Sequence, residues 1–225
     1  MIKFVGQELI ELLITPITVL ALILAYLLGS VPTAVWVGKY FHGIDVREYG
    51  SGNAGATNTF RVLGTKAGIP VLLIDVFKGW LAVNLAYILT EPGQNTEELF
   101  NLQLRLGACA LLGHIFPIFA GFRGGKGVAT LLGIVLALNL EAALLSIAVF
   151  LFVFLSTRYV SLSSIIASLF FPIVVMAIIK TEQPAMVVFS LVISVIVVIT
   201  HQKNIERLLK RQESRIKFRK SNNRK

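Results

Sequence analysis

Charged residues are scarce in this sequence, and cysteine is nearly absent. Asp, Glu, Lys and Arg make up 15% of the 225 residues, whereas 56% of the residues are hydrophobic. Because soluble domains carry about 25% charged residues, this composition excludes an ordinary soluble protein. Long apolar runs recur along the chain instead, as in an integral membrane protein built of helices. The single cysteine, Cys109, excludes an intramolecular disulfide framework.

Ligands for a metal ion are also missing. The three histidines, His42, His114 and His201, share no metal-ligand spacing, and no carboxylate cluster accompanies them. We therefore predict no metal site. The net charge of +9 does not indicate nucleic acid, because ten of the 21 Lys and Arg follow His201 in a C-terminal tail. Basic flanks of this kind are typical of the cytoplasmic side of membrane proteins.

Two glycine-rich stretches imitate nucleotide-binding motifs without their context. Residues 50–55 match G-x-G-x-x-G, but they follow an apolar helix and a polar loop rather than a strand, which excludes a dinucleotide fold. Residues 121–127 resemble a Walker A loop, but Ala120 stands in place of its first glycine. Gly127 follows the lysine where Ser or Thr is required. ATP hydrolysis is therefore not supported, and we predict no cofactor.

Seven apolar stretches predict an all-α membrane protein, a compact bundle forming one domain over residues 1–225. They run roughly over 14–37, 67–90, 99–120, 128–140, 142–156, 165–179 and 184–200. Gly29, Ser30 and Pro32 are expected to bend the first. The fourth and fifth hold 13 and 15 residues, whereas a full crossing needs about 20. These two could be tilted short spans, a pair in a thinned bilayer, or one broken hairpin that leaves five crossings.

The distribution of cations predicts the orientation. With seven crossings, 17 of the 21 Lys and Arg fall on one side of the membrane. That side is cytoplasmic by the positive-inside rule, which places the N-terminus outside and the tail, 201–225, in the cytoplasm. Five crossings give the same orientation. Ile205, Leu208 and Leu209 form one face of a basic amphipathic helix, which we expect to lie on an anionic membrane surface.

Four polar stretches interrupt the apolar runs, and all four fall on the cytoplasmic side. They are 50–61, 121–130, 158–164 and 201–205. Each alone could be a turn, since Ser and Asn commonly satisfy loop backbone groups. Their shared side favours one polar site at the membrane surface. Asp75 and Lys78 add charges inside a span, and they can pair because residues three apart share a helix face.

The residue types in these stretches favour binding of a phosphate or another dense anion. Glycine lets backbone N–H groups approach a ligand, Lys126 supplies a mobile charge, and His201 is a candidate proton carrier. The candidate anion-binding residues are Arg61, Arg123, Gly124, Gly125, Lys126, Gly127 and Arg158. The candidates for orienting hydroxyl or carbonyl groups are Ser51, Asn53, Ser161, Ser164 and Asn204. This set suits acyl transfer from an activated anionic donor to a phosphorylated alcohol.

Six motifs resemble the bacterial acyl-phosphate:glycerol-3-phosphate acyltransferases of the PlsY type. They are GSVPTA (29–34), GIDVREYGSGNAGATNTFRVLG (43–64), DVFKG (75–79), GHIFPIFAGFRGGKGVAT (113–130), RYVSLSS (158–164) and HQKNIERLL (201–209). The resemblance implies seven membrane helices, a monomer in the bacterial inner membrane, and a site facing the cytoplasm. It implies transfer of a fatty acyl group from acyl phosphate to the 1-hydroxyl of sn-glycerol 3-phosphate. The products would be lysophosphatidic acid and phosphate, in the first acylation of phospholipid biosynthesis.

The same resemblance assigns the site. Catalytic positions are matched by Ser51, Arg61, Lys126, Ser164, His201 and Asn204, and phosphate-binding positions by Asn53 and the 124–127 loop. Because acyl phosphate is already a mixed anhydride, we expect direct attack by the acceptor hydroxyl, with His201 or a substrate phosphate as the base. One departure is clear: Arg211 replaces a glycine that usually precedes Glu213 in this family. This leaves the conformation beyond Leu209 open.

Two other classes remain open on the residues alone. A small transporter for a phosphorylated solute is also built from helices with glycine breaks, and the intramembrane Asp75 and Lys78 favour it. A non-catalytic scaffold with a lipid-binding tail would leave the glycine and cation stretches unexplained.

Overall fold

The computed structural model describes residues 16–90 and 96–216, and within these ranges every regular element is a helix. Contacts between residues divide the chain into two compact units, Met1–Leu140 and Glu141–Lys225. We call them the N-terminal and C-terminal units and describe each by itself. The start of the first predicted span, much of the acidic 91–98 connection and the last part of the tail lie outside the described residues. A single domain over the whole chain stays a prediction.

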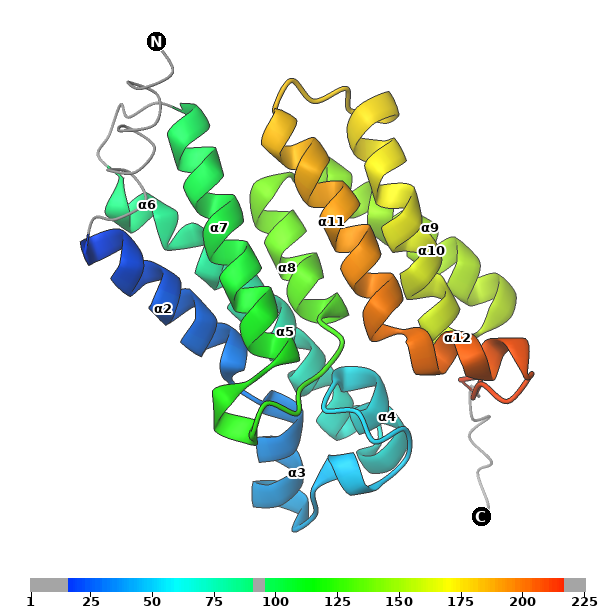
Figure 1. Ribbon diagram of the computed structural model, residues 1–225. Coiled ribbons are helices and arrows are strands. Elements are labelled where there is room, and N and C mark those ends of the chain that lie inside the picture. The colour runs from blue at the N-terminus through cyan, green and yellow to red at the C-terminus, as the bar shows by residue number, and fades with distance from the viewer. Residues whose placement is uncertain (1–15, 91–95, 217–225) are drawn as a thin grey trace, which may run out of the picture. The chain divides into compact units, whose positions relative to one another are not determined.

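The N-terminal unit is a helical bundle with two polar connections (Figure 1). Its helices are α2 (Pro16–Ser30), α3 (Thr33–His42), α4 (Ala56–Leu63), α5 (Thr65–Asn84), α6 (Ala86–Leu89), α7 (Thr96–Ile115) and α8 (Val128–Leu138), with short 3-10 turns at Val46–Glu48 and Ile118–Ala120. The most extensive helix packing is between α2 and α7 and between α5 and α8. These pairs hold the two polar connections at one end of the unit, where Figure 1 shows them.

Small residues allow these helices to approach closely. Ala25, Ala82 and Ala110 are fully buried in one core cluster. A Cβ at Gly29 would collide with the carbonyl oxygen of Ala110, and a Cβ at Gly133 would collide with that of Val76. Close backbone contact through small residues is the usual mode of helix packing in membranes, where burial of apolar surface gives no net drive.

The predicted bend in the first span is confirmed. Helices α2 and α3 meet at an angle of 44°, with Val31 and Pro32 between them. Proline lacks the backbone N–H that would continue the helix, so carbonyl groups of the preceding turn lose their partners. At the break, the carbonyl oxygen of Val31 accepts from the Thr33 N–H at 3.0 Å and from the ammonium group of Lys78 at 2.9 Å. A charged side chain of α5 therefore contacts the backbone at the bend.

The C-terminal unit contains the remaining helices. These are α9 (Leu140–Thr157), α10 (Val160–Ile173) with a π-helical turn at Val174–Ile178, α11 (Pro184–Thr200) and α12 (Gln202–Leu209). Helix α10 packs on α11, and the hydroxyl of Ser194 donates to the carbonyl oxygens of Ser168 and Ser190 at 2.5 and 2.9 Å. The bounds of α11 match the predicted seventh span. Helix α12 leaves α11 at an angle of 61°.

Length and composition support four membrane spans among the described residues, or up to six if each bent helix pair is one span. The prediction that both middle stretches are short is wrong for the second. Helix α9 has 18 residues because Leu140, Glu141 and Thr157 join the apolar run. An acidic residue is favourable in a first helical turn, which explains why Glu141 extends the helix rather than ending it. Helix α8 keeps 11 residues, and the total of seven spans stays a prediction.

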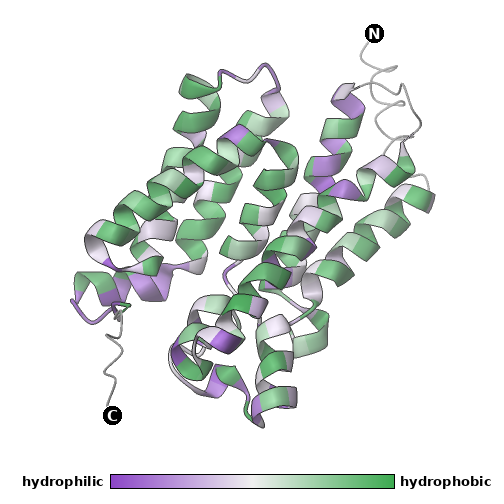
Figure 2. Ribbon diagram, turned by 180° about the vertical axis from the view of Figure 1, so that it is seen from behind, coloured by the Kyte–Doolittle hydropathy of each residue, from purple (hydrophilic) through white to green (hydrophobic). Residues whose placement is uncertain are grey.

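Hydropathy is distributed as expected for such helices. Figure 2 shows mostly hydrophobic residues along α2, α9 and α11 and a hydrophilic stretch at α12. Large apolar side chains such as Leu73, Phe152 and Val195 are exposed on the helix surfaces. Exposed apolar side chains on long helices are favourable in the hydrocarbon core of a bilayer and unfavourable in water.

Candidate active site

The first polar connection of the N-terminal unit is organised by Asn58. This side chain is buried, and its amide nitrogen donates to the carbonyl oxygens of Val46 and Tyr49 at 2.7 and 3.1 Å. Its amide oxygen accepts from the backbone N–H of Ser51 at 2.8 Å and from the Ser51 hydroxyl at 3.1 Å. Gly50 adopts a φ of +63°, and a Cβ there would collide with Asn58 Oδ1. One asparagine thus fixes both the loop and the position of Ser51.

Arg47 ties this first connection to the glycine loop. Its guanidinium pairs with the Asp45 carboxylate at 2.7 Å and donates to the carbonyl oxygens of Ala120 and Arg123 at 2.7 and 3.3 Å. The hydrogen bond from Arg47 lowers the pKa of Asp45, although partial burial opposes the shift. Asp45 is therefore ionised at neutral pH and holds Arg47 in place. The two polar stretches of this unit are linked by direct contact.

The glycine loop leads from α7 into α8 and has a constrained backbone. Gly127 caps the start of α8 with a φ of +83°, which an L side chain rarely adopts. The N–H of Gly125 donates to the carbonyl oxygen of His114 at 3.1 Å. That donor is therefore committed within the protein, so an anion at this loop would depend on the other groups. Lys126 is partly exposed and Arg123 is exposed.

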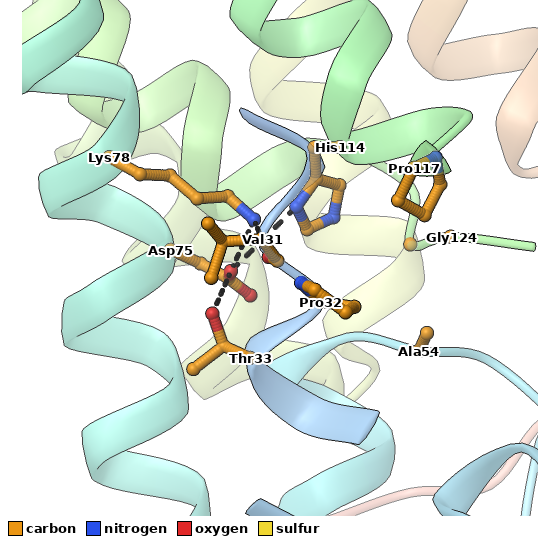
Figure 3. Close-up of a pocket in the computed structure, with 10 residues that line it drawn as sticks. Val31, Pro32, Thr33, Ala54, Asp75, Lys78, His114, Pro117 and Gly124 are labelled. Atoms are coloured by element: carbon orange, nitrogen blue, oxygen red, sulfur yellow. Dashed lines mark hydrogen bonds and ion pairs between the residues drawn. The ribbon is translucent and has the colours of Figure 1, made fainter. Parts of the chain in front are cut away.

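A cluster of buried polar side chains lies against this loop (Figure 3). Lys78 Nζ lies 2.8 Å from Asp75 Oδ1, which confirms the predicted pair. The same oxygen accepts from the Thr33 hydroxyl at 3.1 Å and lies 3.8 Å from His114 Nδ1. The hydroxyl of Thr130 lies 3.1 Å from His114 Nδ1. Thr33, Asp75, Lys78 and His114 line a small pocket together with Val31, Pro32, Ala54, Pro117, Gly124 and Gly125.

In the C-terminal unit, Glu213 gathers polar groups from two helices. It accepts hydrogen bonds from Ser161 at 2.8 Å, Asn204 at 2.7 Å and Arg207 at 2.8 Å. Burial alone would raise the pKa of Glu213, but these three hydrogen bonds outweigh it and the pKa is lowered. The chain reaches this position through Arg211, which adopts a φ of +56°. Arg211 thus takes the left-handed conformation that suits the glycine it replaces.

His201 lies at the junction of α11 and α12. Its side chain is buried, and Nδ1 lies 2.8 Å from the carbonyl oxygen of Val197. Because a carbonyl can only accept, Nδ1 carries a proton in this contact. In the neutral form of the ring, the lone pair is then on Nε2. Ser164 donates to the carbonyl oxygen of Val160 at 2.9 Å. Arg158 is exposed and ends α9 with a φ of +61°.

Comparison with known proteins identifies the family. A family model described as glycerol-3-phosphate acyltransferase matches residues 19–211. The glycerol-3-phosphate acyltransferase of Geobacillus kaustophilus is 45% identical over 201 residues, which cover 89% of this chain and 97% of that protein. The enzyme of Enterococcus faecalis is 42% identical over 207 residues, covering 89% and 92%. This chain belongs to the PlsY family of glycerol-3-phosphate acyltransferases.

Solved structures of PlsY agree with the family assignment of this acyltransferase. PlsY is an integral membrane glycerol 3-phosphate acyltransferase, and its glycerol 3-phosphate form matches this structure with a TM-score of 0.78 at 38% identity. The match covers 89% of this chain and 96% of that one. The lysophosphatidic acid form of PlsY matches with a TM-score of 0.75. This acyltransferase is accordingly an all-helical integral membrane protein.

Each unit of the acyltransferase holds part of the predicted site. The N-terminal unit contains Ser51, Asn53, Arg61, Arg123, Gly124, Gly125, Lys126 and Gly127. The C-terminal unit contains Arg158, Ser161, Ser164, His201 and Asn204. Contacts bring the 50–58 and 121–127 stretches together through Arg47, and Ser161 and Asn204 together through Glu213. Arg61 is exposed on the last turn of α4.

Sequence reasoning about the acyltransferase missed four residues that contact the predicted site residues. They are Arg47, Asn58, His114 and Glu213. Each lies inside or next to a motif that was recognised, but none has an isolated sequence signal. An asparagine in a glycine-rich stretch predicts a turn. The hydrogen-bond partners of Asn58 are two carbonyl oxygens and Ser51, and they are known only from the folded loop. Among the described residues, no group of three His, Cys, Asp or Glu side chains is placed to hold a metal ion.

Proposed function

We propose that this acyltransferase moves a fatty acyl group from acyl phosphate to the 1-hydroxyl of sn-glycerol 3-phosphate. The products are lysophosphatidic acid and inorganic phosphate. The observation that carries this proposal is the match, over 89% of this chain, to PlsY in a glycerol 3-phosphate form and in a lysophosphatidic acid form. Glycerol 3-phosphate and lysophosphatidic acid are the acceptor and the product of one acylation. The acyl phosphate donor rests on the PlsY family resemblance and on the chemistry of the polar residues.

The reaction needs no cofactor because acyl phosphate is an activated mixed anhydride. The acceptor hydroxyl attacks the acyl carbon, the acyl C–O bond to phosphate breaks, and phosphate departs with the bonding pair. The hydroxyl proton goes to a base or to a substrate phosphate. The enzyme must hold two mutually repelling anions in attack geometry, and such orientation can lower a barrier by about 7–11 kcal/mol.

Residues of the N-terminal unit supply charge and fixed donors in this proposal. Arg61 and Lys126 offset the phosphate charge and stabilise the negative charge that develops on the acyl oxygen and the leaving phosphate. Their side chains are exposed and partly exposed, respectively, which suits contact with a polar substrate. Ser51 is held by Asn58 and orients a substrate group, with Asn53 in the same stretch binding phosphate.

Residues of the C-terminal unit supply the base and further polar contacts in this proposal. His201 presents Nε2 as the proton acceptor, since its Nδ1 proton is directed to the Val197 carbonyl. Ser164 and Asn204 position substrate groups, and Arg158 binds phosphate. The hydroxyls of Ser51 and Ser164 donate to an amide oxygen and a backbone carbonyl, respectively. Neither acceptor is a base, which supports direct transfer without an acyl-serine.

The proposed setting is the bacterial inner membrane. The cation distribution supports a cytoplasmic site and an N-terminus outside, for five or seven crossings alike. The seven apolar stretches support seven crossings, and we propose a monomer. The transporter alternative depended on Asp75 and Lys78. Their charges are paired with each other and hydrogen-bonded within the bundle, to Thr33 and to the Val31 carbonyl, so this pair does not favour transport.

The deciding experiment uses purified full-length protein in detergent, without nucleotide. Acyl phosphate and glycerol 3-phosphate are mixed with the protein, and lysophosphatidic acid and phosphate are measured together. We expect equimolar release of both products, and none when acyl-CoA or acyl-loaded carrier protein replaces acyl phosphate. Product formation from acyl-CoA with none from acyl phosphate would overturn the donor. Acid quenching with radiolabelled acyl phosphate tests direct transfer, because a labelled protein band that hydroxylamine removes would show an acyl-enzyme.

A further inference from the structure

We propose that buried Asp75, Lys78 and His114 are positioning residues that fix the 124–127 loop for phosphate binding. We call these three the buried triad. The inference rests on the proposed function, because it assigns a role in substrate binding to side chains deep in the N-terminal unit. They act through backbone and packing, and none of them need touch a substrate. The chain of contacts runs from the bend after α2 to the glycine loop (Figure 3).

The first link joins the loop to His114. The Gly125 N–H donates to the His114 carbonyl oxygen, and a Cβ at Gly125 would collide with Nε2 of the same residue. A Cβ at Gly124 would collide with the His114 carbonyl oxygen and approach Pro117 Cδ. The loop therefore lies against both the backbone and the ring of His114. Gly124 is required for close approach to the backbone of His114 and Gly125 for close approach to its ring, and these contacts explain both glycines without a ligand.

The second link sets the orientation of the His114 ring. Nδ1 lies 3.1 Å from the Thr130 hydroxyl and 3.8 Å from Asp75 Oδ1, while the opposite edge of the ring meets Gly125. Thr130 is fully buried in the first turn of α8, directly after the loop. A rotation of the ring would break the contact with Thr130 and move Nε2 against the loop backbone. The polar edge of the ring thus controls the space that the loop occupies.

The third link holds Asp75. Lys78 Nζ at 2.8 Å and the Thr33 hydroxyl at 3.1 Å both contact Asp75 Oδ1, and Lys78 also donates to the Val31 carbonyl. Asp75 and Lys78 are 1% and 5% exposed. A buried ion pair gains little net stability, because desolvation offsets the attraction, and apolar replacement of both partners is often neutral. The pair is therefore better explained by geometry than by stability.

The contact between Gly125 and His114 allows a double-mutant test in the purified full-length enzyme. Gly125→Ala adds a methyl group where His114 Nε2 lies, and His114→Ala removes that ring. We expect each single variant to raise the KM for glycerol 3-phosphate or acyl phosphate at least tenfold. In the double variant the new methyl group has room. The fold increase in KM should therefore be at least ten times smaller than the product of the fold increases in the two single variants. Multiplicative effects would overturn the proposal.

A matched control separates positioning from loss of packing. Gly107→Ala lies on the same helix as His114, and its Cβ would come within 2.9 Å of Ile134 on α8 without touching the loop. We expect it to lower the thermal unfolding temperature while both KM values stay within twofold of wild type. A KM increase in this control equal to that of His114→Ala would show that any disturbance of α7 acts alike, and would refute a specific role.

The ion pair is tested by removing both charges together. Asp75→Leu with Lys78→Leu leaves no unpaired charge, so the unfolding temperature should stay near that of wild type. We expect KM to rise at least tenfold and binding of glycerol 3-phosphate, measured by calorimetry, to weaken equally. Unchanged KM and binding would overturn the inference alone. An inactive wild-type enzyme would instead overturn the proposed function, so the two failures are distinguishable.

Discussion

Asn204 donates a hydrogen bond of 2.7 Å to Glu213, nine residues further along the chain. The same carboxylate accepts from Ser161 on α10 and from Arg207 on α12. Glu213, which follows α12, therefore determines where the side-chain amide of Asn204 lies, a group predicted to be catalytic. The contact requires the chain to reverse direction after Leu209, and Arg211 makes this possible by adopting a positive φ.

Glu213→Gln should destabilise the C-terminal unit and reduce activity. The glutamine amide presents one acceptor and one donor group to three donors, so at least one partner loses its hydrogen bond. Such a loss costs about 1–3 kcal/mol in a buried site. Urea unfolding in detergent measures the effect. As a control, Glu206→Gln removes an exposed pair with Lys210 at 2.6 Å and should have little effect. Equal stability of the two variants would contradict the role of Glu213.

The same carboxylate predicts a dependence of stability on pH. The pKa of Glu213 is lowered in the folded protein, so folding favours its ionised form. Its contribution is therefore full above the unfolded-state pKa, about 4.3, and is lost as the pH falls through the lower folded pKa. The difference in unfolding free energy between wild type and Glu213→Gln should be constant from pH 7 to about pH 5 and shrink below that. A difference that persists at pH 3 would exclude this linkage.

Arg211→Gly should stabilise the protein. The left-handed conformation costs an L residue about 1–2 kcal/mol, and glycine adopts it freely. Because glycine also increases the entropy of the unfolded chain, we expect a net gain of about 0.5–1 kcal/mol. Lys210→Gly is the matched control: Lys210 has a φ of −81°, so glycine there brings the entropic cost without relief and should destabilise. Both are measured by urea unfolding.

Apolar runs predicted the long helices well, because mean hydropathy depends on composition over many residues. The orientation predicted from the cations stays a prediction. The bend at Pro32, the Asp75–Lys78 pair and the bounds of α11 follow from local rules of helix geometry. The length of α9 was missed because its ends depend on Glu141 fitting a first helical turn rather than on hydropathy. The supports of the site were missed for another reason: Asn58 acts through partners up to twelve residues away.

Asn58→Asp should damage both stability and activity. Aspartate keeps the shape and the acceptor for Ser51, but it cannot donate to the Val46 and Tyr49 carbonyls. Two carbonyl groups would lose their donor, and the loss at the buried Val46 costs about 1–3 kcal/mol. We expect a clear loss of stability and at least a tenfold fall in kcat/KM. Ser51→Ala separates the two effects, since it should reduce activity with stability unchanged. Wild-type activity for Asn58→Asp would disprove the coupling between this loop and catalysis.

Lys126→Ala should abolish turnover while leaving the protein folded. The partly exposed ammonium group lies on the glycine loop, where the proposal has it offset charge on the leaving phosphate and the acyl oxygen. Removing a single group that stabilises such charge typically costs a factor of about 10²–10³ in rate. Lys126→Arg should recover part of the activity, because it restores the charge but not the compact ammonium group. Lys66→Ala, an exposed lysine at the start of α5, is the control for a general loss of positive charge. The role of Lys126 as an anion-binding group fails if Lys126→Ala keeps near-wild-type kcat/KM, or if the arginine variant is as inactive as the alanine variant.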